Sequence, residues 1–498
     1  MSENVENEEK EEKEEKEENE ENEGKEENKN EEFLPTLSEP LINIETSDKS
    51  LYKKFIIIGI IIFMILVLLS INIYFIFIFK ENQNYIKAKY LIEDPGEETK
   101  LFHASFLKLI DVMRIDGKMV EKNNTKTFEK EGNHTIELYF IKELSSLDSL
   151  FFSVNTLIEV DLSNLHSKKI ITSSDMFNGC KNLSKINFDN FIPSKLYNIS
   201  NMFTGCSSLT YIDLSNFKGN LIKDMFGLFS GCTNLTSINL QNFKTKNVIN
   251  MSNLFSGCIS LEEINLNNFA TENVVDMSNM FYGCCSLTSL NLDKFNTSKV
   301  VHMYGMFDGC RSIKNLSLNN FDTKNVENMF FMFADCVSLT SLNINNFDTS
   351  NVIDMFGMFK NCSNLEKIDI SNFNVINVFD MGDIFDNCTS LKAINLYDLK
   401  IENLKYMIGM FESCTSLISL NLSSFNTKNV IDTRYLLNNC KNLQNIDFSL
   451  FNTSKILYYE GIFDGLPQSG IIRYNSEIFN QDIIDLLPSN WNLENINN

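Results

Sequence analysis

Cysteine is the residue type in this sequence whose reactivity and spacing are most unusual. Eleven of the twelve cysteines stand 26 residues apart without exception, and the twelfth, Cys285, directly follows one of them. Thiols at such spacing could form disulfides, bind a metal ion or act as nucleophiles, or they could simply pack in a core. The eleven residues, called the thiol ladder below, are Cys180, Cys206, Cys232, Cys258, Cys284, Cys310, Cys336, Cys362, Cys388, Cys414 and Cys440.

The pattern favours buried, unreacted thiols. Free cysteine behaves as a small hydrophobic residue and is among the most often buried types. Disulfides between neighbouring repeats are the alternative, but equivalent side chains in stacked repeats point in parallel, and eleven of them cannot all pair. A zinc site is supported even less than disulfides, because no C-x2-C pair or histidine accompanies the cysteines. Cys285 lies outside the ladder, and we interpret it as a neutral substitution, with a reactive thiol as the alternative.

Other motifs that carry chemistry are missing from the sequence. Of the four histidines, only His302 lies in the regular repeats, where it replaces an aspartate. The sequence contains no H-E-x-x-H, phosphate-loop, G-x-S-x-G or kinase motif, and no calcium loop of the EF-hand type. We therefore expect no enzymatic activity, no cofactor and no bound metal.

The repeat itself predicts the fold. The 26-residue period runs through about residues 148–475 and indicates a solenoid of about thirteen coils. In the coil that begins at Cys258, residues Leu261 to Leu266 read L-x-x-I-x-L, and this alternation predicts a short strand with one buried face. Stacked coils would join such strands into a parallel sheet. The predicted fold class is an α/β repeat solenoid with one short parallel strand and one short helix per coil.

The helix is predicted from the second half of each coil. Asp276 is a good N-cap residue, because its side chain can accept hydrogen bonds from the first turn. Met277, Met280 and Phe281 then lie at helical spacing and form one apolar face. Gly283 would end the helix in a left-handed conformation.

A polar strip is predicted along the outward side of the strands. Its residues recur at one position of successive coils and alternate with buried ones. The strip is either a hydrogen-bonded asparagine ladder that keeps the protein soluble, or a shallow groove for a glycan or an extended partner. Multivalent weak contact along the array would suit the second interpretation. Its residues are Asn239, Asn265, Asn291, Asn343, Asp369, Asn395 and Asn421, with Tyr211 and Tyr397 as the main aromatic exceptions.

The chain before the repeats divides by composition. Residues 1–54 hold 20 acidic and 8 basic residues, which predicts a disordered tail that either spaces the chain from a membrane or docks a partner. Residues 55–79 carry no charge and are long enough to span a bilayer, which favours a single-pass membrane anchor over a buried core helix. The resulting net charge of this tail, 8 − 20 = −12 of the chain's −23, argues against binding to nucleic acid.

The remaining segments are expected to flank the solenoid. Residues 80–100 are predicted to form a polar stalk, and residues 101–147 a small β-rich cap on the first coil. Residues 476–498 are predicted to form a helical C-terminal cap, in which Ser476 begins a helix that Pro488 ends. Lys53 and Lys54 lean toward a cytosolic N-terminus, and twelve N-x-S/T sequons that all follow the span permit an extracellular C-terminal part.

The repeat resembles a known family. The pattern M-x2-M-F-x-G-C-x2-L-x2-I-N-L-x-N-F-x-T-x-N-V, seen from Met277 to Val300, is similar to that of the BspA-like leucine-rich repeat surface proteins, with related repeats in mycoplasma lipoproteins and protist surface proteins. The resemblance covers about residues 148–475. It implies a leucine-rich-repeat solenoid, display on a cell surface and a role in adhesion or recognition, and it transfers no catalytic residue. The N-terminal apolar span and acidic tail depart from the bacterial members.

These features together predict a plasma-membrane protein with a cytosolic N-terminus and an extracellular repeat domain. We expect this domain to mediate adhesion to, or recognition of, protein or glycan partners. Two alternatives stay open: a structural spacer that binds nothing, or a membrane-tethered intracellular scaffold if the topology is reversed.

Overall fold

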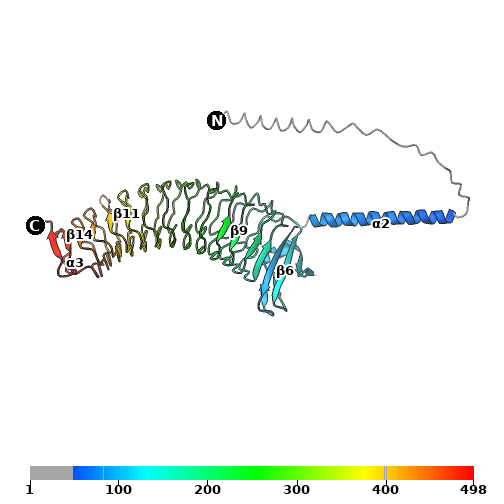
Figure 1. Cartoon of the computed structure of the whole chain (residues 1–498), viewed down its shortest axis with the longest axis horizontal. Coiled ribbons are helices and arrows are strands. Elements are labelled where there is room, and N and C mark those ends of the chain that lie inside the picture. The colour runs from blue at the N-terminus through cyan, green and yellow to red at the C-terminus, as the bar shows by residue number, and fades with distance from the viewer. Residues whose placement is uncertain (1–48, 82–83, 397–398, 400, 498) are drawn as a thin grey trace, which may run out of the picture. The chain divides into compact units, whose positions relative to one another are not determined.

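The computed structural model describes residues 49–81, 84–396, 399 and 401–497, and separates into two units, Met1–Ile78 and Phe79–Asn498. The predicted disordered tail lies almost entirely outside the described residues, and so does Tyr397 of the polar strip. Figure 1 shows the helix α2 (Lys49–Glu81) and, in the second unit, a long row of stacked coils.

Helix α2 contains the predicted membrane span. Within it, Lys53–Ser70 has a mean hydropathy of 2.5, and none of this stretch is buried against the rest of the structure. Among the described residues, α2 is the one helix that is both long enough and apolar enough to cross a membrane. Its composition and its exposure are therefore compatible with a single-pass anchor.

A mixed six-stranded sheet begins the second unit. It runs in the order β4 (Lys118–Val120), β3 (Ile110–Ile115), β6 (Gly132–Phe140), β1 (Tyr85–Ile92), β7 (Leu157–Asp161) and β8 (Lys185–Asn187). Strands β1 and β6 are antiparallel, whereas β7 and β8 are parallel and already belong to the solenoid. A small sheet of β2 (Glu98–Lys100) and β5 (Thr125–Thr127) and the 3-10 helix η1 (Ala104–Lys108) complete this region.

The structure corrects the prediction of a polar stalk at residues 80–100. Strand β1 lies inside the sheet between β6 and β7, and Ile86, Ala88, Tyr90 and Ile92 on its inner face are buried. These residues alternate with exposed or half-buried ones, which is the pattern of a strand with one face in the core. Burial of this apolar face, together with pairing on both sides, keeps the segment folded against the first coil.

The solenoid itself has about twelve coils. Parallel pairing joins β9 (Tyr211–Asp213) to β10 (Ser237–Asn239) and β11 (Lys367–Asp369) to β12 (Ala393–Asn395). The last sheet contains β13 (Ser419–Asn421), β14 (Asn445–Phe448), β15 (Ile471–Tyr474) and β16 (Asn492–Asn495), all parallel. The predicted parallel strands are thus present in the first and last coils. Leu261–Leu266 in the middle follows the same path without strand pairing.

The expectation of one helix per coil is wrong. The segment from Asp276 to Gly283 forms successive turns, and Asn279, with a φ of 53°, interrupts any helical path. Asp276 still accepts a hydrogen bond from the amide of Ser278 at 2.9 Å, but this closes a single turn. In the described part of the second unit, the one α-helix is the four-residue α3 (Gln481–Ile484).

Hydrogen bonds to the next coil explain why the helix does not form. The amides of Asn253, Phe255 and Gly257 donate to Ser278, Met280 and Tyr282 at 2.9, 2.9 and 2.6 Å. Every second amide therefore points along the solenoid, whereas a helix would direct all of them back along its own axis. At the start of this segment, equivalent residues of successive coils form twelve parallel bridges in a row, from Ser146 to Tyr458. The apolar spacing of this segment serves a stacked turn as well as it would serve a helix.

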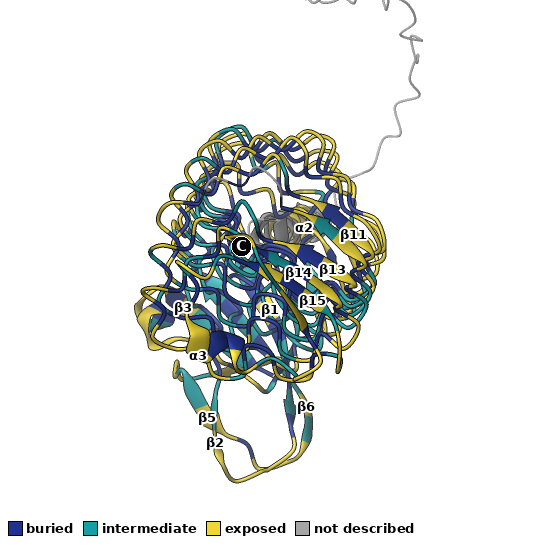
Figure 2. Ribbon diagram, turned by 90° about the vertical axis from the view of Figure 1, so that its left-hand side faces the viewer, coloured by how far each residue is buried: buried dark blue, intermediate teal, exposed yellow. Residues whose placement is uncertain are grey.

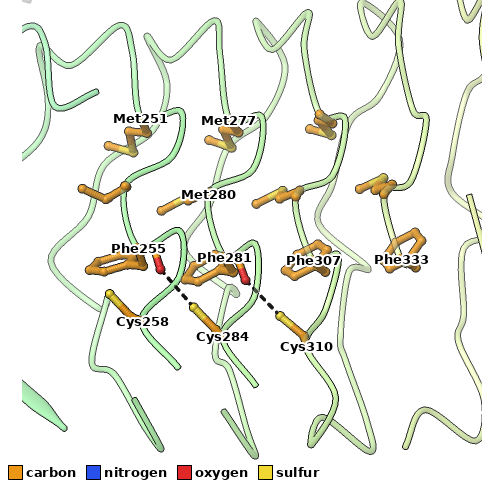
Figure 3. Packing of buried hydrophobic residues seen from close by; sticks show 14 of the residues in the cluster. Met251, Phe255, Cys258, Met277, Met280, Phe281, Cys284, Phe307, Cys310 and Phe333 are labelled. Carbon is orange, nitrogen blue, oxygen red and sulfur yellow. Dashed lines mark hydrogen bonds between the residues drawn. The ribbon is translucent and has the colours of Figure 1, made fainter. Parts of the chain in front are cut away.

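Side chains stack in columns inside the coils. One phenylalanine per coil, from Phe151 to Phe411, stacks on its counterpart in the next coil. The ring centroids are 5.5–5.9 Å apart, and the planes of the two rings differ by 16° or less. Figure 3 shows this column between a column of methionines and the thiol ladder. In Figure 2, seen along the coils, buried residues face the interior and exposed residues the outside. Offset aromatic stacking adds to the burial of each ring.

Buried threonines join the coils on a further column. Thr271 donates to the carbonyl of Asn296 at 2.9 Å and accepts from the amide of the same residue at 2.7 Å. The same two-way contact with the next coil is made by the threonines at this position in four other coils, Thr245, Thr297, Thr349 and Thr427. Their hydroxyl groups are buried, but each donates and accepts a hydrogen bond, so that burying them costs little free energy of desolvation. The contacts also fix the register of neighbouring coils.

The C-terminal end also differs from the expectation. Asn480, and not Ser476, caps helix α3, by accepting from the amide of Asp482 at 2.9 Å. The helix ends at Ile484, and Trp491 is buried with its indole donating to the carbonyl of Pro467 at 2.9 Å. Strand β16 then pairs with β15 and covers the last coil.

The aromatic column makes a direct prediction for stability. Replacing Phe281 by alanine removes a fully buried ring that stacks on both neighbours, and should lower the free energy of unfolding by about 3–5 kcal/mol. Replacing the adjacent Tyr282, whose side chain is 46% exposed, should change it by less than about 0.5 kcal/mol. Denaturant titration of both variants tests this, and equal losses would contradict the column as a main source of stability.

Candidate functional site

The thiol ladder lies in the core and is not a reactive site. All eleven ladder cysteines are buried and free, and each Sγ donates to the carbonyl oxygen of the phenylalanine 29 residues earlier at 2.9–3.3 Å. Burial raises the pKa of Cys180, Cys232 and Cys284 to about 12. The thiols are thus neutral at physiological pH, and a neutral thiol is a poor nucleophile and metal ligand.

Cys285 differs from its neighbour. It is half-buried and free, and lies beside the ladder rather than in it. Among the described residues, no group of three or more histidine, cysteine or acidic side chains is arranged to hold a metal ion.

The polar strip is exposed, but its side chains already have a structural role. The side-chain oxygens of Asn265, Asn291 and Asn421 accept from the backbone amides two residues later at 3.1, 3.0 and 2.8 Å. Asn239, Asn343 and Asp369 make the same turn. Such turns end each strand. The strip therefore comes from turn chemistry within each coil, with a cross-coil bond such as Asn343 to Asn319, 3.2 Å, as an addition.

The two remaining strip residues are placed as follows. Tyr211 is 50% exposed at the start of β9, and its hydroxyl lies 3.3 Å from the carboxylate of Asp213. Asn395 ends β12 and is exposed. The described strip residues thus lie at the ends of strands in some coils and in the equivalent unpaired segments of the middle coils.

A second surface adjoins the strip at its N-terminal end. On the outer face of the six-stranded sheet, the register places Arg114, Glu137, Lys87 and Asp161 in one row across β3, β6, β1 and β7. The next row contains Thr135, Lys89, Glu159 and Lys185. Charges of opposite sign alternate in both rows, and Lys89 pairs with Glu159 at 3.4 Å. Such pairs stabilise the sheet modestly and leave donors and acceptors of both signs at the surface.

Aromatic side chains stand beside these rows. Tyr85 and Tyr139 stack with their ring centroids 4.9 Å apart, and the guanidinium of Arg114 lies 5.1 Å from the Tyr139 ring. The Tyr139 hydroxyl donates to Glu137 at 2.9 Å. Burial, and then the hydrogen bond to the Glu137 carboxylate, raise the pKa of Tyr139 to about 12, so this hydroxyl stays protonated. The cluster is thereby held in one conformation.

Part of the first row, Lys87 and Asp161, and the whole second row line an open groove of about 440 Å³ that crosses β1, β7 and β8. Lys87, Lys89, Glu159 and Lys185 line it. We call this surface, formed by Tyr85, Lys87, Lys89, Arg114, Tyr139, Glu159 and Lys185, the N-terminal face.

Sequence reasoning missed the N-terminal face, because it placed Tyr85, Lys87 and Lys89 in a stalk. The signal was present: residues 85–92 read Y-I-K-A-K-Y-L-I, in which apolar inner positions alternate with Lys87 and Lys89 on the other side.

Comparison with known proteins assigns the repeat. The family model described as "Mycoplasma protein of unknown function, DUF285" matches six overlapping stretches, residues 119–237, 198–316, 223–341, 302–419, 359–472 and 405–498. Together they cover most of the chain, including the six-stranded sheet from β6 onward. The chain belongs to the DUF285 family.

Similarity beyond the DUF285 family is weak. A chain in the "Crystal structure of TLR13-ssRNA13 complex" is 18% identical, with a TM-score of 0.20. The match covers 61% of the DUF285 protein and 48% of that chain, so the protein spans about half the length of this structural relative. No curated protein was found to match the sequence.

The buried thiols predict a specific dependence of stability on pH. A ladder thiol that titrates near 9 when unfolded and at about 12 when folded stabilises the fold below pH 9. Between pH 9 and 12 the free energy of unfolding should fall by about 1.4 kcal/mol per pH unit for each such thiol. Denaturant titrations at a series of pH values measure this slope.

A ladder variant supplies the control. Cys284→Ala should make the slope shallower by about 1.4 kcal/mol per pH unit, the contribution of one thiol. An unchanged slope in this variant would contradict the assignment of Cys284 to the core.

Proposed function

We propose that this DUF285 protein is a membrane-anchored recognition protein that binds an extracellular protein or glycan through its N-terminal face. The observation that carries the proposal is the ordered cluster of Tyr85, Tyr139 and Arg114 at the edge of an open, charged groove. The polar strip would extend this surface along the coils with weaker contacts.

The residue types of the N-terminal face support this role. Tyrosine and arginine are enriched among the residues that dominate binding energy at protein interfaces, because they offer large contact area with a polar end. Stacking and hydrogen bonding hold these side chains in place before a partner arrives, so that little conformational entropy would be lost on binding. Donors and acceptors of both signs in the groove also suit the hydroxyl groups of a glycan.

The anchor is supported by α2, whose apolar stretch is long enough to span a bilayer. Lys53 and Lys54 at its N-terminal end favour a cytosolic N-terminus and an extracellular solenoid.

One observation favours a second candidate, a membrane-tethered intracellular scaffold. Eleven unpaired thiols in one domain are typical of a reducing compartment, since extracellular proteins usually oxidise theirs. Burial would protect the thiols in either compartment, so membrane topology has to decide. A spacer that binds nothing is the third possibility, and it differs from both in having no dependence on the N-terminal face.

Topology is tested by protease treatment of intact cells that express the chain with a tag at each end. Loss of the C-terminal tag with protection of the N-terminal one supports an extracellular recognition domain. Loss of the N-terminal tag alone would overturn it in favour of the intracellular scaffold.

Recognition is tested by the double substitution Tyr85→Ala with Arg114→Ala. If the N-terminal face binds the partner, attachment of the purified protein to cells or matrix should weaken by about 30-fold or more, the loss of one strong contact residue. Asn343→Lys, in the middle of the strip, should weaken it much less, and thermal unfolding verifies that both variants fold. A loss with Asn343→Lys alone would move the site to the strip, and no loss in either variant would indicate a spacer.

A further inference from the structure

Two aspartates hold the same place in coils two repeats apart. Asp380 accepts from the amide of Gly382 at 2.8 Å, and Asp432 accepts from the amide of Arg434 at 3.1 Å. Each also forms a parallel bridge to a tyrosine of the following coil, Asp380 to Tyr406 and Asp432 to Tyr458. The two sites thus share a carboxylate, a turn and an aromatic neighbour.

At Asp432 the chain supplies its own cation. The guanidinium of Arg434 contacts the carboxylate with two nitrogens, Nε to Oδ1 at 3.0 Å and Nη2 to Oδ2 at 2.7 Å. It also lies 5.5 Å from the centroid of the Tyr458 ring. Paired contact with a carboxylate and stacking on an aromatic ring are the two interactions that suit a guanidinium best. Beneath its arginine, Asp432 is only 4% exposed.

At Asp380 the residue in the arginine position is Gly382, which has no side chain. Asp380 is half-buried and more exposed than Asp432, and no ion pair reaches it from any residue that the structure describes. The carboxylate, the turn and Tyr406 are present, and the cation is the one component that the described residues do not provide.

Phe356 of the preceding coil adds a second aromatic wall. A Cβ atom at Gly382 would lie 3.1 Å from the edge of the Phe356 ring and 3.1 Å from Oδ1 of Asp380. Ring and carboxylate therefore meet at the point where a side chain would begin. Phe356 is itself held by Phe331, whose ring is perpendicular to it at 5.3 Å, and Tyr406 is held by Phe379 in the same manner at 6.5 Å.

The electrostatic surroundings favour a positive ligand. Burial, and then the nearby carboxylates of Asp354, Asp383 and Asp432, raise the pKa of Asp380 to about 6 against the hydrogen bond from Gly382. Lys360, which contacts one of these acids, is already paired with Asp383 and Asp386 at 2.7 and 2.9 Å. The charge of Asp380 is therefore not neutralised by an ion pair from any residue within the described ranges.

We propose that Asp380, Tyr406 and Phe356 form a receptor for the guanidinium group of a partner's arginine side chain. The carboxylate pairs with the guanidinium as Asp432 does with Arg434, and Tyr406 packs on it as Tyr458 does on Arg434, with Phe356 as an additional ring. This site is separate from the N-terminal face and does not depend on membrane topology.

The test uses the full chain in detergent and N-acetyl-L-arginine amide as the probe, with binding followed by calorimetry or ligand-observed NMR at pH 7.5. We expect one saturable site. Asp380→Asn should weaken binding by about tenfold or more, the loss of a charge-assisted pair, while the turn survives because asparagine forms it at equivalent positions such as Asn250. Binding should also be lost as the pH falls through about 6, because Asp380 is then protonated.

A double variant, Arg434→Gly with Ile408→Phe, provides a gain-of-function counterpart. Ile408 occupies in the coil before Asp432 the position that Phe356 occupies before Asp380. Removing the internal arginine and adding this ring recreates at Asp432 the components present at Asp380, so the double variant should bind a second equivalent of the probe. Gly382→Arg should fill the site from within and abolish binding of the first. Absence of saturable binding to the wild-type chain, binding that Asp380→Asn does not weaken, or a folded double variant with no second site would each overturn the proposal.

Discussion

Backbone hydrogen bonding from each coil to the next is the constraint on which the rest of this structure depends. Every second amide in the turn segments donates to the following coil, and twelve parallel bridges continue the contact from Ser146 to Tyr458. A donor that points along the solenoid meets an acceptor only if the next coil has the same length and path. The unbroken 26-residue spacing follows from this requirement, since a single inserted residue would displace every later partner.

The side-chain columns follow from the same constraint. Identical coils bring identical side chains into register, so phenylalanines stack on phenylalanines and each thiol reaches the carbonyl of a phenylalanine in an earlier coil. The columns offer little reactive chemistry, because their threonine hydroxyls are hydrogen-bonded and their thiols are neutral; Ser173, in the methionine column, has the one buried side-chain oxygen among the described residues that lacks a partner. Function is therefore expected where the repetition is broken: at the sheet that covers the first coil, and at Gly382, where one residue of a column is missing.

The period, the buried columns and the outward strip were predictable because they depend on which residues recur. Sequence alone could not decide between a helix and a stack of turns, since Asp276, Met280 and Gly283 suit both, and only the acceptors of the next coil distinguish them. The N-terminal face was missed for a related reason. Tyr85 and Lys87 become part of a sheet through strands β6 and β7, which lie more than forty residues away along the chain. That Gly382 occupies the position at which Arg434 pairs with an aspartate could be seen only from the contacts made in the two coils.

Deletion of a whole coil tests the central claim most directly. Removing residues 285–310 joins Cys284 to Arg311 and keeps every column in register, so the shortened chain should unfold cooperatively with a melting temperature close to that of the parent. Removing residues 285–309 takes out 25 residues instead of 26. Every later coil is then shifted by one residue relative to the coils before it, which should abolish cooperative unfolding of the solenoid. Equal stability of the two deletions would contradict the account, because register between coils would then not be what holds the structure together.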